Sequence, residues 1–244
     1  RWCYPGGAGV VAFTGVECVM TGDPRVVEGA RNVGKISVDE LRNLSFRGAE
    51  VVAPSALSYK DVEMDVRVVY YQHGDLLTGG TSIEGQFQNL IDLREGRLSC
   101  VTVAGRAIRN SPGVLAELAG ALGDADINID CVASGMDSVT FYVDDEMAER
   151  AETLLHDAVV EDDVLSSVTV DDDIAVVRVT GGELPAESGI LRDIVEPLEE
   201  AHLTVHDLVT SATSVAVFVD WADREEVLSI VQDQVSISHE TVSR

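Results

Sequence analysis

The loop Arg109-Asn-Ser-Pro-Gly113 and the run Asn128-Ile-Asp130 carry the side chains best suited to recognise a small ligand. The loop precedes an apolar stripe of helical period, so a ligand carboxylate can dock on the free amides at the start of a helix. Gly113 permits a close approach of the backbone. We expect Asn128–Asp130 to face this helix start, where the Asp130 carboxylate would accept an ammonium group. Carboxylate and ammonium together describe an amino acid.

A second candidate for anion binding is Arg25, at the end of the turn Thr21-Gly-Asp-Pro-Arg25. A guanidinium fork suits a phosphate, although a surface salt bridge is the alternative interpretation. Phosphoryl transfer needs several groups that position and neutralise the phosphates, and Gly6-Gly-Ala-Gly9 alone is not a phosphate loop. The four cysteines and five histidines show no metal-ligand spacing. The sequence therefore predicts no catalytic residue and no metal site.

The elements around the first candidate site occur twice, at a constant offset that places Leu98 on Ile174 and needs no gap. Leu98–Gly105 aligns with Ile174–Gly181, and each is a β-branched run ended by glycine, which predicts a strand and a turn. A helix follows in both copies, with Ser111 and Ser188 as the expected caps and Pro112 as the first residue of the helix in the first copy. A period this long indicates a duplicated domain.

Each copy continues with a hairpin, a second helix and a last strand. The paired ranges are Ile127–Ser134 and Leu203–Thr210, Ser138–Val143 and Ser214–Val219, Glu146–Val159 and Ala222–Val235, and Ser167–Val170 and Ser236–Val242. This β-α-β-β-α-β order predicts an antiparallel sheet with both helices on one face. The copies span residues 96–171 and 172–244. Asp171–Asp173 is interpreted as a solvated linker between them. Whether the last strand of the second copy pairs with the first copy is left open.

The two copies differ at the candidate site. Ser111 and Asn128 can also be read as plain capping and turn residues. In the second copy Ser188 replaces Pro112 and His206 replaces Asp130, so we expect a vestigial or structural site there. Pro197 is expected to kink or end the second copy's first helix, because it removes an amide donor.

Residues 1–95 have a different texture. They read as strand Val10–Phe13, a capped helix Ser37–Phe46, and strands Glu50–Val52 and Val66–Tyr71. These are too few strands for a doubly wound sheet, and the sequence begins with arginine. We therefore expect the end of an α/β domain whose beginning lies outside this sequence; a self-sufficient small α/β domain is the alternative.

Composition excludes several classes of function. The 244 residues are 45% hydrophobic, enough for packed cores, and contain no run of roughly 18 apolar residues that could span a membrane, so we expect a cytoplasmic protein. A net charge of −26 would repel nucleic acid and anionic membranes. Only Lys35 and Lys60 are lysines among 17 basic residues. Dispersed acids with few lysines are typical of a salt-loving organism, because molar salt screens their repulsion.

Three motifs in order now point to one family. Thr14-Gly-Val-Glu-Cys-Val-Met-Thr-Gly-Asp-Pro-Arg25 resembles the T-D-V-D-G-x-Y-T-x-D-P-R motif of aspartate kinases. Ile36-Ser-Val-Asp-Glu-Leu41 and Gly48-Ala-Glu-Val-Val-Ala-Pro54 resemble that family's I-S-Y-x-E-x and G-A-K-V-L-H-P segments. The resemblance implies an α/β fold: the C-terminal part of an amino-acid-kinase-type domain in residues 1–95, followed by two ferredoxin-like βαββαβ domains of the ACT type.

The resemblance also implies an activity and two sites. The activity is ATP-dependent phosphorylation of the L-aspartate β-carboxylate with Mg²⁺, on the route to lysine, threonine and methionine, with feedback by lysine or threonine and a homodimer formed through the ACT domains. The implied nucleotide-binding residues are Thr14, Gly15, Met20, Arg25, Glu50 and Val51. The implied effector-binding residues are Ile108, Ser111, Gly113, Val114, Asn128, Ile129, Asp130 and Ser134.

Several departures from the family pattern argue against activity of this chain alone. Gly15 stands where the family has an acid, Cys18 where it has glycine, Glu50 where it has lysine and Ala53 where it has histidine. The family's phosphate-holding lysine and its aspartate-binding Arg-Gly-Gly-Ser-Asp segment have no counterpart. The rival interpretation is a non-catalytic amino-acid sensor; an acetylglutamate kinase is disfavoured by the tandem ACT pair.

Overall fold

The chain is described by a computed structural model that divides into two compact units. The first unit is Arg1–Leu90 with Thr180–Ser188 and Thr210–Ser214, and the second is the remainder. None of the described helices is long and apolar enough to cross a membrane. The structure describes residues 2–3, 9–14, 18–49, 51–57, 59–70, 79–86, 90–106, 108–181 and 189–242.

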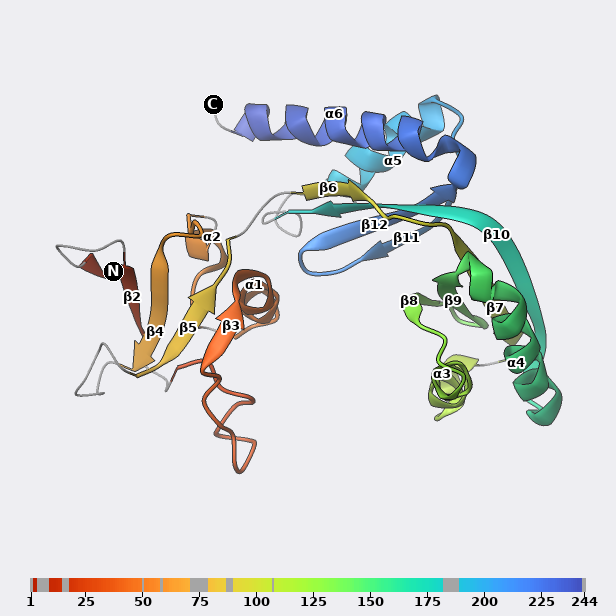
Figure 1. Cartoon of the computed structure of the whole chain (residues 1–244), viewed down its shortest axis with the longest axis horizontal. Helices are drawn as coiled ribbons and strands as arrows, with labels where there is room; N and C mark the ends of the chain where they lie inside the picture. The colour runs from red at the N-terminus through yellow and green to blue at the C-terminus, as the bar shows by residue number, and fades with distance from the viewer. Residues whose placement is uncertain are drawn as a thin grey trace. The chain divides into compact units, whose positions relative to one another are not determined.

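The first unit contains a mixed five-stranded sheet in the order β1-β2-β4-β5-β3 (Figure 1). Its strands are β1 (Trp2–Cys3), β2 (Gly9–Thr14), β3 (Lys35–Ser37), β4 (Asp65–Tyr70) and β5 (Thr81–Glu84). β2 runs parallel to β4, β3 runs parallel to β5, and β4 is antiparallel to β5. The sheet is therefore mixed, as is common among α/β folds.

Helix α1 (Val38–Phe46) begins as the sequence predicts. Ser37 is its N-cap and forms a reciprocal capping box with Glu40, and Val38 and Leu41 are buried in the core of this unit. Helix α2 (Pro54–Leu57) follows. The predicted strand Glu50–Val52 is wrong where it can be checked, because Val51 and Val52 lie in a turn; Glu50 lies outside the described residues.

The second unit contains most of both copies of the duplication, whose segments Thr180–Ser188 and Thr210–Ser214 are counted with the first unit. The first copy comprises β7 (Leu98–Gly105), α3 (Val114–Asp124), β8 (Ile129–Ser134), β9 (Ser138–Asp144) and α4 (Ala148–Glu161). The second comprises the later part of β10 (Leu165–Thr180), α5 (Ile190–Glu200), β11 (Val205–Thr210), β12 (Ser214–Asp220) and α6 (Arg224–Val242). Short 3₁₀ turns η1 (Ile108–Asn110), η2 (Asp145–Met147) and η3 (Trp221–Asp223) complete the copies.

The repeat extends to single backbone angles. Gly113 (φ 99°) and Gly189 (φ 108°) cap α3 and α5 in the left-handed region, which glycine enters without strain. Asp126 and His202 follow the same helices with φ of 58° and 59°. The N-cap is therefore Gly113, and the expected cap at Ser111 is wrong; Ser188 lies outside the described residues. Helix α5 also continues past Pro197 to Glu200, so the expected early end is wrong.

The two copies share one seven-stranded sheet by exchanging strands (Figure 1). Strand β10 is continuous, so Asp171–Asp173 lies inside a strand and does not form a linker, although all three residues are exposed as expected. The first half of β10 pairs with β7 of the first copy, with Val170 opposite Val101. Beyond the irregularity at Asp171–Ile174, the second half lies against β6 (Leu90–Leu93), since the Arg94 amide donates to the Val176 carbonyl at 3.1 Å.

Strand β6 therefore takes the place that the sequence assigned to a last strand. At the offset of the duplication, Leu90–Leu93 aligns with Ser166–Thr169 in β10. The strand that precedes each copy therefore pairs in the sheet of the other copy: β6 pairs with the second half of β10, and the first half of β10 pairs with β7. The predicted last strand Ser236–Val242 is wrong, because these residues belong to α6. The copies are interleaved from the N-terminal side of the duplication, not from its C-terminal end.

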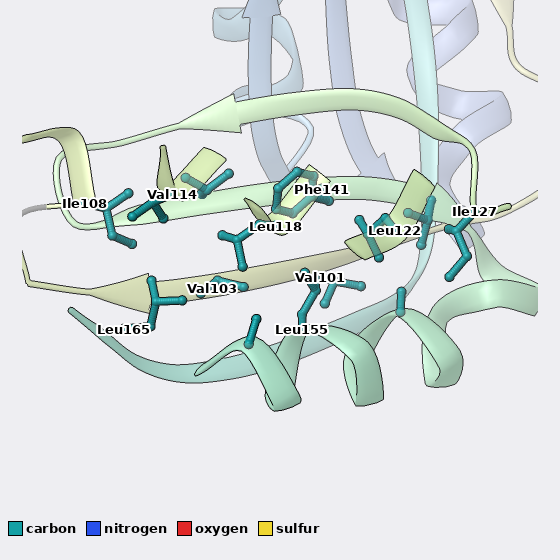
Figure 2. Packing of buried hydrophobic residues seen from close by; sticks show 14 residues of the cluster. Val101, Val103, Ile108, Val114, Leu118, Leu122, Ile127, Phe141, Leu155 and Leu165 are labelled. Carbon is teal, nitrogen blue, oxygen red and sulfur yellow. The ribbon is translucent and has the colours of Figure 1, made fainter. Parts of the chain in front are cut away.

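One face of the first copy's sheet is covered by its helices. Alternate strand residues such as Val101, Val103 and Phe141 meet Leu118 of α3 and Leu155 of α4 in one buried cluster (Figure 2). This is the period-two burial expected of a strand with one covered face. The prediction that both helices cover one face of the sheet is confirmed for this copy.

The opposite faces of the two copies cover each other. Tyr142 of β9 stacks on Phe218 of β12, its counterpart in the repeat, with ring centroids 3.8 Å apart. Leu98 and Ile174, also counterparts, are paired across β7 and β10 and belong to the same buried cluster. Pairing of each residue with its own repeat counterpart shows that the copies are related by a local two-fold rotation.

In the contact between the two copies, the pair Tyr142 and Asp207 departs from this two-fold symmetry. The Tyr142 hydroxyl donates to Asp207 Oδ2 at 3.1 Å, whereas Phe218 has no hydroxyl and Cys131 stands at the position equivalent to Asp207. Burial of the ring, with the nearby Asp207 carboxylate, raises the pKa of Tyr142 far above its usual range. Tyr142 therefore keeps its proton and remains a donor across the whole working pH range.

Replacing Tyr142 by phenylalanine should destabilise the second unit by about 1 kcal/mol, because the half-buried Asp207 carboxylate loses its donor. The double variant Tyr142→Phe with Asp207→Cys copies the Phe218 and Cys131 pair and should recover most of this loss. Urea unfolding followed by circular dichroism measures both effects. A double variant no more stable than Tyr142→Phe would contradict the assigned role of the hydroxyl.

Candidate functional site

The helix-start half of the predicted effector site is assembled around η1 and α3. Ile108 and Val114 are both buried, at 6% and 5% exposure, and belong to the helix-side core (Figure 2). Ser111 is half-buried, and its amide donates to the Ile108 carbonyl at 3.1 Å. Gly113 is exposed, and its open N-cap leaves the first amides of α3 without partners from their own helix. This end can receive a carboxylate.

The strand half of the predicted site lies elsewhere. Helix α3 has 11 residues, or about 16 Å, and the chain turns back directly into β8, where the Ile127 amide donates to the Leu122 carbonyl at 3.0 Å. Figure 2 shows Ile127 beside Leu122, at the opposite end of the cluster from Ile108 and Val114. Within one chain, the expectation that Asn128–Asp130 faces the start of α3 is therefore wrong.

The eight predicted effector residues thus form two groups, one around η1, the start of α3 and the end of β8, and the other around the start of β8. Ser134 ends β8 opposite Val139, which belongs to the same end of the cluster as Val103. One group is Ile108, Ser111, Gly113, Val114 and Ser134; the other is Asn128, Ile129 and Asp130. Ile129 packs against the helix-side core, while Asn128 is exposed. β8 ends the order of strands in the shared sheet, so both groups lie along its edge.

Asp130 is engaged by an arginine that sequence reasoning missed. Arg94 Nη2 donates to Asp130 Oδ2 and, at 2.7 Å, to Asp144 Oδ1. Burial opposes the charged guanidinium, but the hydrogen bonds that it donates to Asp144 and Asp130 outweigh this effect and raise the pKa of Arg94. The side chains of Arg94 and Asp130 are only 20% and 23% exposed, so this ion pair is partly shielded from solvent.

The second copy builds a related cluster from different positions. His206 replaces Asp130, with its Nε2 2.8 Å from Asp220 Oδ1 and its Nδ1 3.4 Å from Asp171 Oδ2. Asp220 is the counterpart of Asp144. A basic side chain between two carboxylates occurs in both copies, but here it comes from the strand itself. The second copy therefore offers no carboxylate at the place where Asp130 stands.

The predicted nucleotide residues that can be described are spread over the first unit. Thr14 ends β2, opposite Tyr70 of β4, and Met20 is half-buried in an isolated bridge to Asn32. Arg25 is exposed and pairs with Asp23 at 2.9 Å, as the salt-bridge alternative requires. Val51 is half-buried against the core of this unit. Gly15 and Glu50 lie outside the described residues.

Three basic side chains of this unit, Arg25, Lys35 and Lys60, already have partners. The Arg25 hydrogen bond lowers the pKa of Asp23, and Lys35 pairs with Glu84 at 2.5 Å. The buried Lys60 Nζ donates to the carbonyls of Gly85 and Asp61 at 2.6 and 3.0 Å. These cations are already matched within the described residues, so phosphate binding would need groups beyond them.

Thr81 organises the loop that carries the family-like motif, and sequence reasoning missed it. Its buried hydroxyl accepts the Val19 amide at 3.1 Å and donates to Asn32 Oδ1 at 3.0 Å. Thr21 and Arg31 add two hydrogen bonds across the same loop, at 2.9 and 3.0 Å. The segment between Val19 and Asn32 is therefore held at its base, with Arg25 near its tip.

Three family models match separate parts of the chain. Residues 6–70 match the Amino acid kinase family, and residues 101–159 and 169–233 each match an ACT domain. Together with the topology, these matches define the class of protein: a segment of amino-acid-kinase type followed by two ACT domains. The predicted fold class is confirmed.

Within that class, the chain is similar to aspartokinases. The aspartokinase of Corynebacterium glutamicum is 25% identical over 93% of this chain and 56% of its own length. Lysine-sensitive aspartokinase 3 of Escherichia coli is 26% identical over 88% of this chain and 49% of its own length. The chain thus spans about half the length of the curated relatives it matches.

Solved structures agree on the fold. Aspartate kinase from Synechocystis superposes with a TM-score of 0.77 at 19% identity, covering 91% of this chain and 42% of that one. The regulatory subunit of aspartate kinase from Thermus flavus gives a TM-score of 0.54 at 18% identity, covering 61% of this chain and 97% of that one. The second structure corresponds in extent to a regulatory region alone.

Proposed function

We propose that this chain is the C-terminal part of a cytoplasmic aspartate kinase, comprising the end of its catalytic domain and its regulatory ACT pair. The single observation that carries the proposal is the aspartokinase similarity along 93% of the chain, through both kinase-type and ACT segments. The complete protein would transfer the γ-phosphoryl group of Mg-ATP to an oxygen of the aspartate β-carboxylate, releasing ADP. Thr14, Gly15, Met20, Arg25, Glu50 and Val51 would contribute to the nucleotide side of that site.

A polypeptide that adds the preceding kinase segment of the same reading frame should form ADP from Mg-ATP only when aspartate is present. The present chain alone should form none, because Arg25, Lys35 and Lys60 are already paired with carboxylates and carbonyls and phosphoryl transfer needs several positioned charges. A coupled ADP assay, with hydroxylamine trapping of the acyl phosphate, measures this; glutamate and acetylglutamate serve as control substrates. Absence of aspartate-dependent ADP would remove the catalytic assignment and favour the sensor alternative.

We infer that the first ACT copy is the effector site, completed by a second chain. One end of its β8 edge presents the amides of α3, and the other presents Asp130. A two-fold dimer that pairs this edge antiparallel would bring each end against the opposite end of the partner. Leu115 and Met136, exposed at 48% and 66% on α3 and the β8–β9 turn, supply apolar surface for such a contact. E. coli aspartokinase III has been solved with lysine and aspartate, which favours a small amino acid as effector.

Calorimetric titration of this chain in molar KCl should show saturable binding of one amino acid among lysine, threonine and methionine. Asp130→Asn should weaken that binding about tenfold or more, since a charge-assisted hydrogen bond to the ligand ammonium is lost. His206→Asn, at the equivalent position of the second copy, is the matched control and should leave affinity unchanged. Equal losses in both variants would contradict the assignment to the first copy.

We also propose that the protein works in concentrated salt. Its net charge of −26 is dispersed over a chain with 17 basic residues, and screening shortens the Debye length from about 10 Å at 0.1 M to about 3 Å at 1 M salt. The acidic surface should therefore repel itself strongly only in dilute buffer.

Raising KCl from about 0.1 M to about 1 M should raise the thermal unfolding midpoint by roughly 4–8 °C, corresponding to about 2 kcal/mol. Differential scanning calorimetry measures the change, and an equal osmolality of sucrose controls for water activity. A midpoint that rises equally in sucrose, or does not rise in KCl, would show that charge screening is not what stabilises this fold.

A further inference from the structure

Arg94 is the described residue that connects the predicted effector carboxylate to the rest of the second unit. Its Nη2 donates to Asp130 and to Asp144 Oδ1, the latter at 2.7 Å. Its Nη1 donates to the carbonyls of Glu95 and Gly96, at 2.8 and 3.3 Å. The guanidinium is thus fixed over the turn that follows β6, and it is bound to the Asp130 carboxylate, the group that a ligand ammonium would need as its acceptor.

We propose that Arg94 is an internal counter-cation of Asp130, and that an amino-acid effector binds by displacing its guanidinium from this carboxylate. The proposal rests on the function proposed above, in which Asp130 accepts the effector's ammonium group. A guanidinium and an ammonium held by one carboxylate would repel each other at close range. The displaced guanidinium can still pair with Asp144, so replacement of the guanidinium by the ligand ammonium leaves no buried charge without a partner.

The comparison of the two copies supports a role tied to Asp130. At the offset of the duplication, Arg94 corresponds to Val170 and Asp130 to His206. The second copy thus has His206 in place of the acid and Val170 in place of the arginine. His206 contacts two other carboxylates, those of Asp171 and Asp220. A general structural role for the arginine would not require its loss together with the acid.

The backbone of the same residue holds β6 in the sheet. The Arg94 amide donates to the Val176 carbonyl at 3.1 Å, next to a strand of only four residues. β6 is also the segment through which the chain passes from the first unit into the second. Displacement of the guanidinium by an effector therefore removes one of the contacts that hold this short strand, and effector binding should loosen it.

Arg97 provides a matched control on the same turn. It pairs with Asp173 at 2.5 Å, with side chains 50% and 65% exposed, and it does not involve Asp130. Arg94→Gln and Arg97→Gln remove the same charge from neighbouring positions of the chain. Any effect of net charge alone on the binding of a cationic ligand would be common to both variants.

Titration of the full chain with lysine, threonine and methionine tests the proposal. Arg94→Gln should bind the effector about tenfold more tightly than the unchanged chain, because the competing charge-assisted bond is gone, whereas Arg97→Gln should stay within about twofold of it. Binding that appears only in Arg94→Gln would support the proposal equally. Unchanged or weaker binding by Arg94→Gln, with a folded circular dichroism spectrum, would overturn it.

Amide hydrogen exchange supplies a second readout. Effector should speed exchange of the Arg94 amide in the unchanged chain and in Arg97→Gln, whereas in Arg94→Gln exchange should be fast already without effector. No acceleration by a bound effector would overturn the link to β6. If neither the unchanged chain nor Arg94→Gln binds any of the three amino acids, the proposed effector site is contradicted. If both bind an amino acid with equal affinity, only the proposed role of Arg94 as a counter-cation is contradicted.

Discussion

The structure depends on one packing requirement: each ACT sheet has helices on a single face, and its other face must still be covered. The two copies meet this requirement by covering each other, with Tyr142 stacked on Phe218 and Leu98 paired with Ile174. The resulting cluster is hydrophobic, and the Tyr142 hydroxyl donates a hydrogen bond to Asp207 beside it. Burial of such a face is worth on the order of 25 cal/mol per Å², so separation of the copies would expose a costly surface.

Strand exchange follows from the same contact. Once β10 runs through both halves of the sheet, its first half completes the first copy and its second half requires a neighbour, which β6 supplies. Each sheet half then contains a strand from the other copy, so the two copies should unfold together as one cooperative unit. The exchange also places Arg94, which follows a strand in one copy's sheet, against the carboxylates Asp130 and Asp144 of the other.

Much of this fold could be predicted from the sequence, because the constant offset between the two copies reports both element order and burial pattern. What failed were choices that local pattern cannot decide. Ser111 and Gly113 both suit a helix cap, and only the observed φ of 99° selects the glycine. Ser236–Val242 alternates weakly enough to suit a strand or a helix, and its place was already taken by β6. Extending the alignment upstream to Leu90–Leu93 would have revealed that strand, and with it Arg94.

The site was harder to predict because spacing along the chain does not fix distance in space. The start of α3 and Asp130 are separated by one helix and one turn, which suggests proximity, yet an antiparallel return puts them about a helix length apart. In the proposed dimer, a two-fold rotation would bring each of these two groups of residues against the opposite group of the partner. In the second copy His206 stands where the first copy has Asp130, so both copies keep the packing of the shared sheet and only the first keeps a carboxylate at this position.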